Sequence, residues 1–87
     1  MKLKNGFVLR DVAGQTVVLP AGDDLDLNLM ITLNETGKFL WTLLENDRTE
    51  QQLVQALLNE YDVDEQVATH AVADFIVKLK ENDFLGG

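Results

Sequence analysis

The stretch Asn28-Leu-Met-Ile-Thr-Leu-Asn-Glu-Thr-Gly-Lys-Phe-Leu-Trp41 decides how this chain folds, because its apolar spacing changes at Asn34. Before Asn34, apolar and polar residues alternate, which is typical of a strand with one buried face. After it, apolar residues recur on one helical face. An asparagine side chain can accept hydrogen bonds from the free amides of a helix start. The stretch therefore predicts a strand over about Asp26–Leu33 and a helix over about Glu35–Glu45.

Two further strands are predicted upstream of this junction. Phe7–Arg10 and Thr16–Leu19 are short runs rich in residues that favour sheets. The residues between them favour a turn, with Gly14 free to adopt a positive φ. Pro20 cannot donate to a sheet ladder, so we expect it to stop the second run. The two runs together predict a β-hairpin.

Two more helices are predicted downstream. Thr49 and Gln52 form a capping box, in which each side chain can bond the free backbone amide of the other residue. Asp62–Glu65 places carboxylates at the start of the last helix, where the helix dipole favours them. The apolar face of that helix consists of Val67, Ala68, Ala71, Val72, Phe75 and Leu79.

The predicted order is therefore β-β-β-α-α-α in a single domain over residues 1–87. A three-stranded antiparallel sheet of this size must bury one face against the helices that follow it. We expect an α+β fold with winged-helix-like packing, in which the sheet is followed by a three-helix bundle.

The composition excludes several classes of protein. The 87 residues include seven Lys and Arg against 15 Asp and Glu, which gives a net charge of -8. A protein that binds nucleic acid must neutralise phosphates, so this balance argues against DNA or RNA as a partner. No apolar run approaches the roughly 20 residues that span a bilayer, and no signal peptide is recognisable. We therefore expect a cytoplasmic protein without a membrane partner.

The sequence offers little for catalysis. It contains no cysteine and no serine, and His70 is its only histidine. Thiolate chemistry, disulfides and serine hydrolysis are thus excluded, and no nucleophile, base and orienting group can be assembled. A lone histidine is more often a helix-surface residue than a ligand. We expect a protein that is not an enzyme and uses no metal or cofactor.

Four further local features of the sequence bear on its structure or function. The acidic pattern that begins at Asp24 resembles a calcium loop, but the sixth position is Leu29 instead of glycine. Trp41 is expected to anchor the core, although an exposed tryptophan would indicate a partner surface. Gly37 in a first helical turn suggests close approach of another backbone. The terminal pair Gly86–Gly87 is interpreted as a frayed end.

With these elements in place, the chain resembles the PqqD-like family, also called RiPP recognition elements. The resemblance rests on a pattern that runs through nearly the whole chain, and its most specific part is Leu33–Gly37 followed by Trp41. The other matching pieces are Phe7–Arg10, Val17–Pro20, Phe39–Leu40, Leu43–Leu44, Thr49, Leu53, Leu57, Tyr61–Val63, Phe75, Leu79 and Leu85.

The resemblance implies a function and a site. Such proteins bind the leader segment of a ribosomally made precursor peptide and present it to a modifying enzyme, often a radical-SAM protein or a protease. The leader adds as a strand beside the third strand, in a groove walled by the third helix. Carried over to this sequence, the peptide-binding residues are Asp26, Leu27, Asn28, Leu29, Met30, Ile31, Thr32, Val67, His70, Ala71, Asp74 and Lys78.

One departure from the family pattern keeps an alternative open. Many members have an acidic residue where this chain has Ala71. The alternative is a structural or interaction subunit of a maturation complex that does not bind a leader. A winged-helix nucleic-acid binder is a further alternative, disfavoured by the charge.

Overall fold

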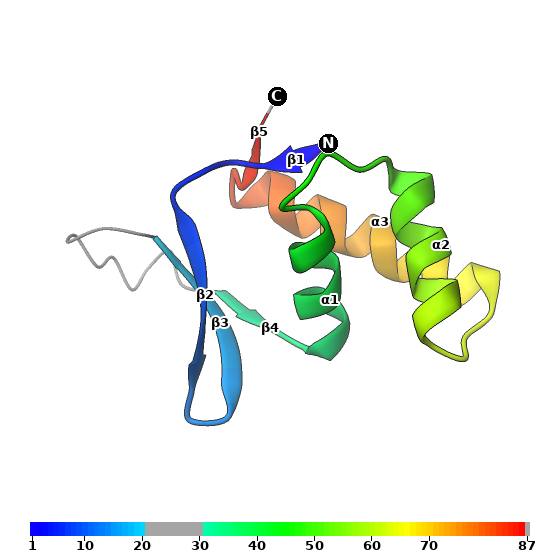
Figure 1. The fold of residues 1–87 in the computed structure, drawn as a ribbon, viewed down its shortest axis with the longest axis horizontal. Coiled ribbons are helices and arrows are strands. Elements are labelled where there is room, and N and C mark those ends of the chain that lie inside the picture. Colours follow the sequence, from blue (N-terminus) through cyan, green and yellow to red (C-terminus); the bar gives the residue numbers. More distant parts are fainter. Residues whose placement is uncertain (21–30, 87) are drawn as a thin grey trace.

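The computed structural model describes residues 1–20 and 31–86 of the chain, and it confirms the predicted α+β fold (Figure 1). In this part of the chain a three-stranded antiparallel sheet has the order β2-β3-β4, and three helices follow it. A second, two-stranded sheet pairs the two ends of the chain. The elements are β1 (Lys2–Leu3), β2 (Phe7–Val12), β3 (Gln15–Pro20), β4 (Ile31–Leu33), α1 (Glu35–Leu43), α2 (Glu50–Glu60), α3 (Glu65–Glu81) and β5 (Leu85–Gly86).

The β2–β3 hairpin turns over two residues, Ala13 and Gly14. Their φ angles are 52° and 80°, so both residues are left-handed, as in a type I′ turn. The positive φ at Gly14 confirms the prediction, whereas that at Ala13 was not foreseen. The primed turn matches the twist of the two strands, so pairing begins immediately, with Val12 opposite Gln15.

Strand β3 ends at Pro20, so the proline is its last residue and not, as the sequence predicted, the first residue beyond it. Pro20 lies opposite Phe7 at the end of the hairpin away from the turn. Along an antiparallel ladder, pairs of residues that exchange backbone hydrogen bonds (bonded pairs) alternate with pairs that do not (non-bonded pairs). Val12 and Gln15 beside the turn are a bonded pair, so five pairs later Phe7 and Pro20 are a non-bonded one. Pro20 therefore belongs to a pair that needs no amide donor toward β2.

The junction between β4 and α1 is formed as predicted. The Asn34 side chain accepts a hydrogen bond of 2.7 Å from the Gly37 amide at the start of α1. The structure describes the third strand over Ile31–Leu33, and the remainder of its predicted range lies outside the described residues. Helix α1 ends at Leu43, two residues before the predicted end, because amides just beyond it bond three residues back and tighten the chain into a turn.

The caps of α2 and α3 explain where those helices begin. The predicted capping box is present, with bonds of 3.1 Å from the Gln52 amide to Thr49 Oγ1 and 2.8 Å from the Thr49 amide to Gln52 Oε1. Asp64 caps α3 and accepts from the Val67 amide at 2.8 Å. Each cap satisfies an amide that the helix itself leaves without a partner.

Two short strands that the sequence did not predict hold the ends of the chain together. Lys2 pairs with Gly86 and Leu3 with Leu85, so Gly86 belongs to a sheet and is not a frayed end (Figure 1). Between α3 and β5, Phe84 is 1% exposed and is among the largest fully buried side chains. Its ring meets Phe7 edge-on at 4.6 Å and Trp41 at 5.5 Å between centroids.

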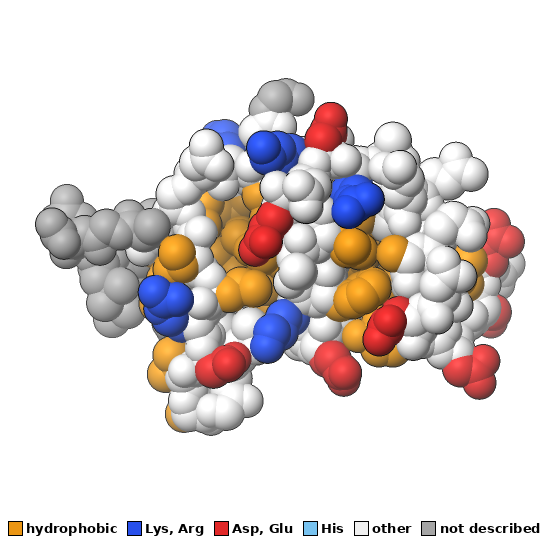
Figure 2. Space-filling view, viewed as in Figure 1, with side chains coloured by type: hydrophobic (Ala, Val, Ile, Leu, Met, Phe, Trp, Pro, Cys, Tyr) orange, Lys and Arg blue, Asp and Glu red, His pale blue; other side chains and the backbone are white. Residues whose placement is uncertain are grey.

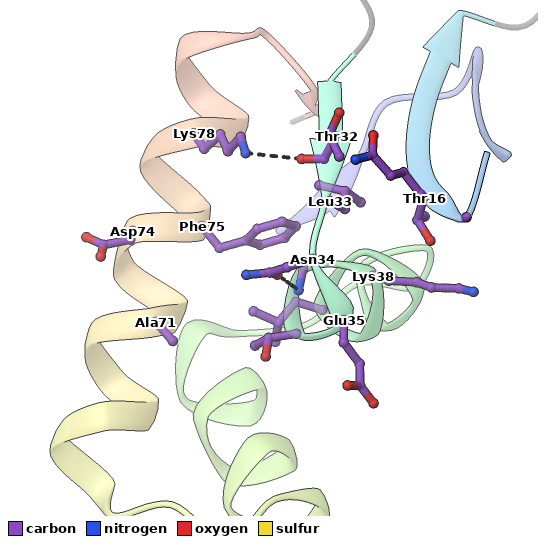
Figure 3. A pocket seen from close by; sticks show the side chains of 15 residues that line it. Thr16, Thr32, Leu33, Asn34, Glu35, Lys38, Ala71, Asp74, Phe75 and Lys78 are labelled. Carbon is purple, nitrogen blue, oxygen red and sulfur yellow. Dashed lines mark hydrogen bonds between the residues drawn. The ribbon is translucent and has the colours of Figure 1, made fainter. Parts of the chain in front are cut away.

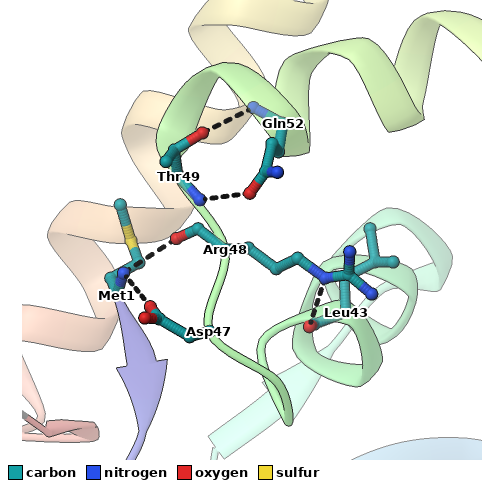
Figure 4. Close-up of polar contacts among 6 residues, drawn as sticks. All are labelled: Met1, Leu43, Asp47, Arg48, Thr49 and Gln52. Atoms are coloured by element: carbon teal, nitrogen blue, oxygen red, sulfur yellow. Dashed lines mark hydrogen bonds and ion pairs between the residues drawn. The ribbon is translucent and has the colours of Figure 1, made fainter.

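The amino terminus is tied to the turn between α1 and α2 (Figure 4). The Met1 amine donates to Asp47 Oδ1 and to the Arg48 carbonyl, each at 2.8 Å, and the Arg48 amide donates to the Met1 carbonyl. The hydrogen bond from this amine, together with its charge, lowers the pKa of Asp47. These contacts hold β1 against the helical part of the molecule.

The core lies between the inner face of the larger sheet and the three helices. Trp41 is 2% exposed, which confirms the predicted core anchor. Hydrophobic side chains reach the surface between the sheet and α1 and between α1 and α2 (Figure 2). In the described parts of the chain, no helix is both long and apolar enough to cross a membrane. The other buried hydrophobic residues include Leu3, Val18, Leu33, Leu40, Leu44, Leu53, Leu57, Val72, Phe75 and Leu79.

Candidate functional site: a groove beside a free strand edge

A groove of about 920 Å³ lies between α3 and β4, at the point where β4 leads into the N-terminal end of α1 (Figure 3). Helix α3 forms one wall, and the strand and the first turn of α1 form the other. At its far end the groove reaches the tip of the β2–β3 hairpin. Its lining consists of Gly14, Gln15, Thr16, Thr32, Leu33, Asn34, Glu35, Thr36, Gly37, Lys38, Leu40, Ala71, Asp74, Phe75 and Lys78.

The edge of β4 that faces α3 is not paired with another strand in the described part of the chain. The register of the sheet determines which residue presents its backbone there. Bonded and non-bonded pairs alternate from the hairpin turn, so Arg10 and Val17 form a bonded pair. Val17 therefore directs its backbone groups toward β2, and its partner on the other side, Thr32, directs its amide and carbonyl away from β3.

A side-chain contact supports this orientation of Thr32 independently. The Lys78 ammonium on α3 donates a hydrogen bond of 3.4 Å to the Thr32 carbonyl (Figure 3). A carbonyl that bonds a side chain on α3 cannot point toward β3. Within a strand the amide and carbonyl of one residue share a direction, so the Thr32 amide also faces the groove.

The wall on α3 follows from helical spacing. Ala71 is followed by Asp74 and Phe75 three and four residues later, and Lys78 follows those two by four and three residues, so all four lie along one side of the helix. Phe75 is 8% exposed and points toward Leu33, so it forms an apolar floor beneath the strand edge (Figure 3). Ala71 is half-buried and adds a methyl group to the same floor. Asp74 and Lys78 are exposed at the rim.

The first turn of α1 closes one end of the groove, and Gly37 is buried there. A Cβ at this position would lie 3.1 Å from Asn34 Oδ1 and 3.4 Å from Leu33 Cβ. The sequence suggested that glycine admits another backbone, but the close neighbours are the capping side chain and Leu33. Glycine thus lets the cap approach the helix, and the cap fixes the direction in which β4 leaves the groove.

The structure brings together some of the residues that the resemblance implied. Thr32, Ala71, Asp74 and Lys78 all line the groove, and Ile31 is half-buried beside it. Val67 is 53% exposed on α3, one turn before Ala71, and does not line it. The remaining strand positions of the implied site, Asp26, Leu27, Asn28, Leu29 and Met30, lie outside the described residues.

His70 faces a different side of α3. It borders a shallow hollow with Glu65, Gln66, Thr69 and Ala73, away from the groove. In the described residues, no group of three or more His, Asp or Glu side chains is placed to hold a metal ion. The charged side chains that line the groove are Asp74 and Lys78 on α3 and Glu35 and Lys38 on α1.

Several lining residues were not among those implied for the site. Phe75 was predicted only on the apolar face of the last helix, although it lies one turn from Ala71 and the same spacing could have placed it in the groove wall. Gly14, Gln15 and Thr16 reach the groove through the pairing of β3 with β4, in which Thr16 lies opposite Leu33. No local pattern in the sequence indicates that long-range contact.

Comparisons with known proteins agree with this architecture. A family model described as coenzyme PQQ synthesis protein D (PqqD) matches residues 15–85. The structure of TbiB1 in complex with the TbiA(beta) leader peptide has 26% identity and a TM-score of 0.77, covering 100% of this chain and 96% of that one. Lasso peptide synthetase B1 complexed with the leader peptide has 22% identity and a TM-score of 0.70, covering 95% and 93%, and this likeness concerns the fold. No curated protein gives a significant match.

Proposed function

Because this chain belongs to the PqqD family, we propose that it binds the leader segment of a ribosomally synthesised precursor peptide and presents it to a modifying enzyme. Two solved structures of similar fold carry a leader peptide, and one of them is 26% identical to this chain over its full length. The observation that carries the proposal is the backbone edge of β4 at Thr32, which no strand of the described residues pairs and which faces an apolar-floored groove.

We propose that the leader binds by strand addition to β4. An unpaired strand edge offers amides and carbonyls that an extended peptide can bond. Thr32 supplies one amide and one carbonyl on that edge, and the apolar floor receives side chains of the added strand. Main-chain bonds then provide affinity and the floor provides sequence preference. In this proposal the leader contacts Asp26–Thr32 along the strand and Ala71, Asp74 and Lys78 on α3. Val67 and His70 lie outside the groove and would contact a part of the leader that extends beyond it.

We propose that the protein acts without catalysis of its own and that the modifying enzyme is a radical-SAM protein or a protease. The absence of cysteine and serine from the sequence, together with a single histidine that is exposed, supports a binding role. The gene neighbourhood is the first check. A short precursor reading frame beside an enzyme gene of either class would agree with this assignment.

A titration tests the proposal directly. The probe is a synthetic peptide corresponding to the leader encoded by the short reading frame nearest to this gene, added to ¹⁵N-labelled protein. We expect amide shifts concentrated at Thr32 on β4 and at Ala71 and Lys78 on α3. Shifts that avoid both elements would reject the groove as the site. A protein that binds the modifying enzyme but no leader would instead support the interaction-subunit alternative raised by Ala71.

A matched pair of proline variants tests the mode of binding. Thr32→Pro removes an amide that faces the groove, and we expect leader affinity to fall about five- to tenfold, because one main-chain hydrogen bond is lost. Asp11→Pro is the control, since Asp11 belongs to a non-bonded pair on the opposite edge strand, so its amide also faces away from β3. Calorimetric titration of both variants with the leader should show a loss of affinity only for Thr32→Pro. Equal affinities in the two variants would contradict strand addition at β4.

A further inference from the structure

In the free protein, a lysine occupies the hydrogen-bond acceptor that an added strand would use. The Lys78 ammonium lies 3.4 Å from the Thr32 carbonyl and so spans the groove from α3 to β4. An added strand paired with β4 has its own amide donor for that carbonyl. A carbonyl can accept two hydrogen bonds, but an added strand occupies the space beside β4 that the Lys78 side chain now crosses, so we expect Lys78 to leave the carbonyl when a peptide strand binds.

The faces of β4 determine how the side chains of such a strand are arranged. Leu33 is buried and Ile31 half-buried, whereas Thr32 between them is exposed. Residues directly opposite each other in a sheet share a face. The ligand residue opposite Thr32 therefore directs its side chain outward, and its two neighbours direct theirs to the inner side, where Phe75 forms the floor. The groove fits an apolar-x-apolar segment.

The charges on the α3 wall give a further preference along this segment. In the described residues, no carboxylate lies within 4.0 Å of the Lys78 ammonium, and the ion pairs found there involve other groups. Asp74, one turn earlier on the helix, points away from the strand (Figure 3). Lys78 lies level with Thr32 and Asp74 lies farther along the groove toward Ala71 (Figure 3). A ligand carboxylate is thus attracted near Thr32 and repelled farther along.

On the premise of the proposed function, we propose that Lys78 selects an acidic residue in the leader. The lysine exchanges the Thr32 carbonyl for a carboxylate of the bound peptide, while a peptide amide takes its place on the strand. Lys78 is then a specificity-determining residue that also protects the free edge, since an edge covered by a lysine is a poor template for other strands. The ligand is an extended apolar-x-apolar peptide with an Asp or Glu beside Thr32.

Peptide selection tests this preference in a way that does not depend on the sequence of the leader. The probe is a displayed library of random twelve-residue peptides, selected in parallel on the native protein, Lys78→Glu and Lys80→Glu. Lys80 is two positions along α3, about 200° around the helix, so its variant matches the charge change on another face. We expect the native protein and Lys80→Glu to enrich acidic residues at one position, and Lys78→Glu to enrich basic residues there.

A double-mutant cycle separates the two roles of Lys78. For a selected peptide, replacing its acidic residue by the matching amide should weaken binding to the native protein about two- to fivefold, the range of an exposed ion pair. The same replacement in the peptide should not change its affinity for the Lys78→Met variant, because methionine keeps an apolar side chain without the charge. The amide peptide should bind Lys78→Met at least as tightly as the native protein, because the hydrogen bond from Lys78 to the Thr32 carbonyl no longer has to break.

The outcomes distinguish this inference from the proposed function. Two results would overturn the role of Lys78 and leave strand addition standing. One is that all three proteins select peptides with the same charge preference. The other is that replacing the acidic residue of the peptide by its amide lowers the affinity for Lys78→Met as much as the affinity for the native protein. If neither the library nor the encoded leader binds the native protein, leader binding itself fails and the inference fails with it. A basic preference confined to Lys78→Glu would establish the inference.

Discussion

At the scale of single residues, the end of α3 contains a strained position. Asp83 has a φ of 58°, and the amides of Asp83 and Phe84 bond the carbonyls of Lys80 and Leu79 in the pattern of a Schellman cap. Glycine favours that left-handed position, whereas a side chain there costs free energy. The Asp83 carboxylate pairs with the Lys4 ammonium at 2.7 Å, but the carboxylate is 85% exposed, so the pair contributes little to stability.

We therefore expect Asp83→Gly to raise the free energy of unfolding, by less than about 1 kcal/mol after the lost ion pair and the added chain entropy are counted. Asp83→Asn is the control, because asparagine tolerates the left-handed region but cannot form the ion pair. It should leave stability nearly unchanged. Urea unfolding measures both variants, and a glycine variant less stable than the asparagine variant would show that the backbone is not strained.

At the scale of elements, two helix caps provide a test of what the strand-to-helix junction does. Asn34 and Thr49 each accept a hydrogen bond from an amide in a first helical turn, but only Asn34 adjoins the groove. Asn34→Ala and Thr49→Ala should each lower the free energy of unfolding by about 0.5–2 kcal/mol. Only Asn34→Ala should also weaken leader binding, because this cap fixes the direction of β4. Equal leader affinity in the two variants, measured by calorimetric titration, would remove Asn34 from the site.

The local features of the elements could be predicted from the sequence, whereas their long-range pairing could not. Asn34, the Thr49 capping box and most of the apolar helix faces were predictable, because caps and periodicity are local signals. Val67 is the exception, since it was predicted on the apolar face of α3 and is 53% exposed. The strands β1 and β5 were not predictable, since a run of two residues has no period and its pairing joins opposite ends of the chain. The left-handed Ala13 was missed because its residue type does not favour that backbone. In the site, the α3 wall was implied by the family resemblance, whereas the hairpin tip reaches the groove through tertiary pairing alone.

At the scale of the whole molecule, Phe84 connects the two sheets to α1. It meets Phe7 of β2 and Trp41 of α1, and it is 1% exposed. Phe84→Ala should lower the free energy of unfolding by about 3–5 kcal/mol, because a large cavity remains in the core. The total for a small domain is about 5–15 kcal/mol, so this variant should be close to unfolding at about 37 °C.

The aromatic pair of Phe39 with Tyr61, at 5.6 Å between centroids, supplies the control for Phe84→Ala. Phe39 is only half-buried, so Phe39→Ala should cost clearly less than Phe84→Ala. Urea unfolding followed by circular dichroism compares the two variants. Equal losses of unfolding free energy in the two variants would mean that the cluster of Phe84, Phe7 and Trp41 does not hold the sheets and helices together.

The pairing of β1 with β5 has a consequence for how this domain can be combined with others. Lys2 lies opposite Gly86, so the two ends of the described chain emerge side by side (Figure 1). A unit with adjacent ends can be spliced into a surface loop of a host protein without being stretched. The groove is lined from β4, α1, α3 and the tip of the hairpin, and no residue of β1 or β5 takes part in it. A host attached through both ends would therefore hold the domain by its terminal strands and leave the proposed peptide-docking edge open.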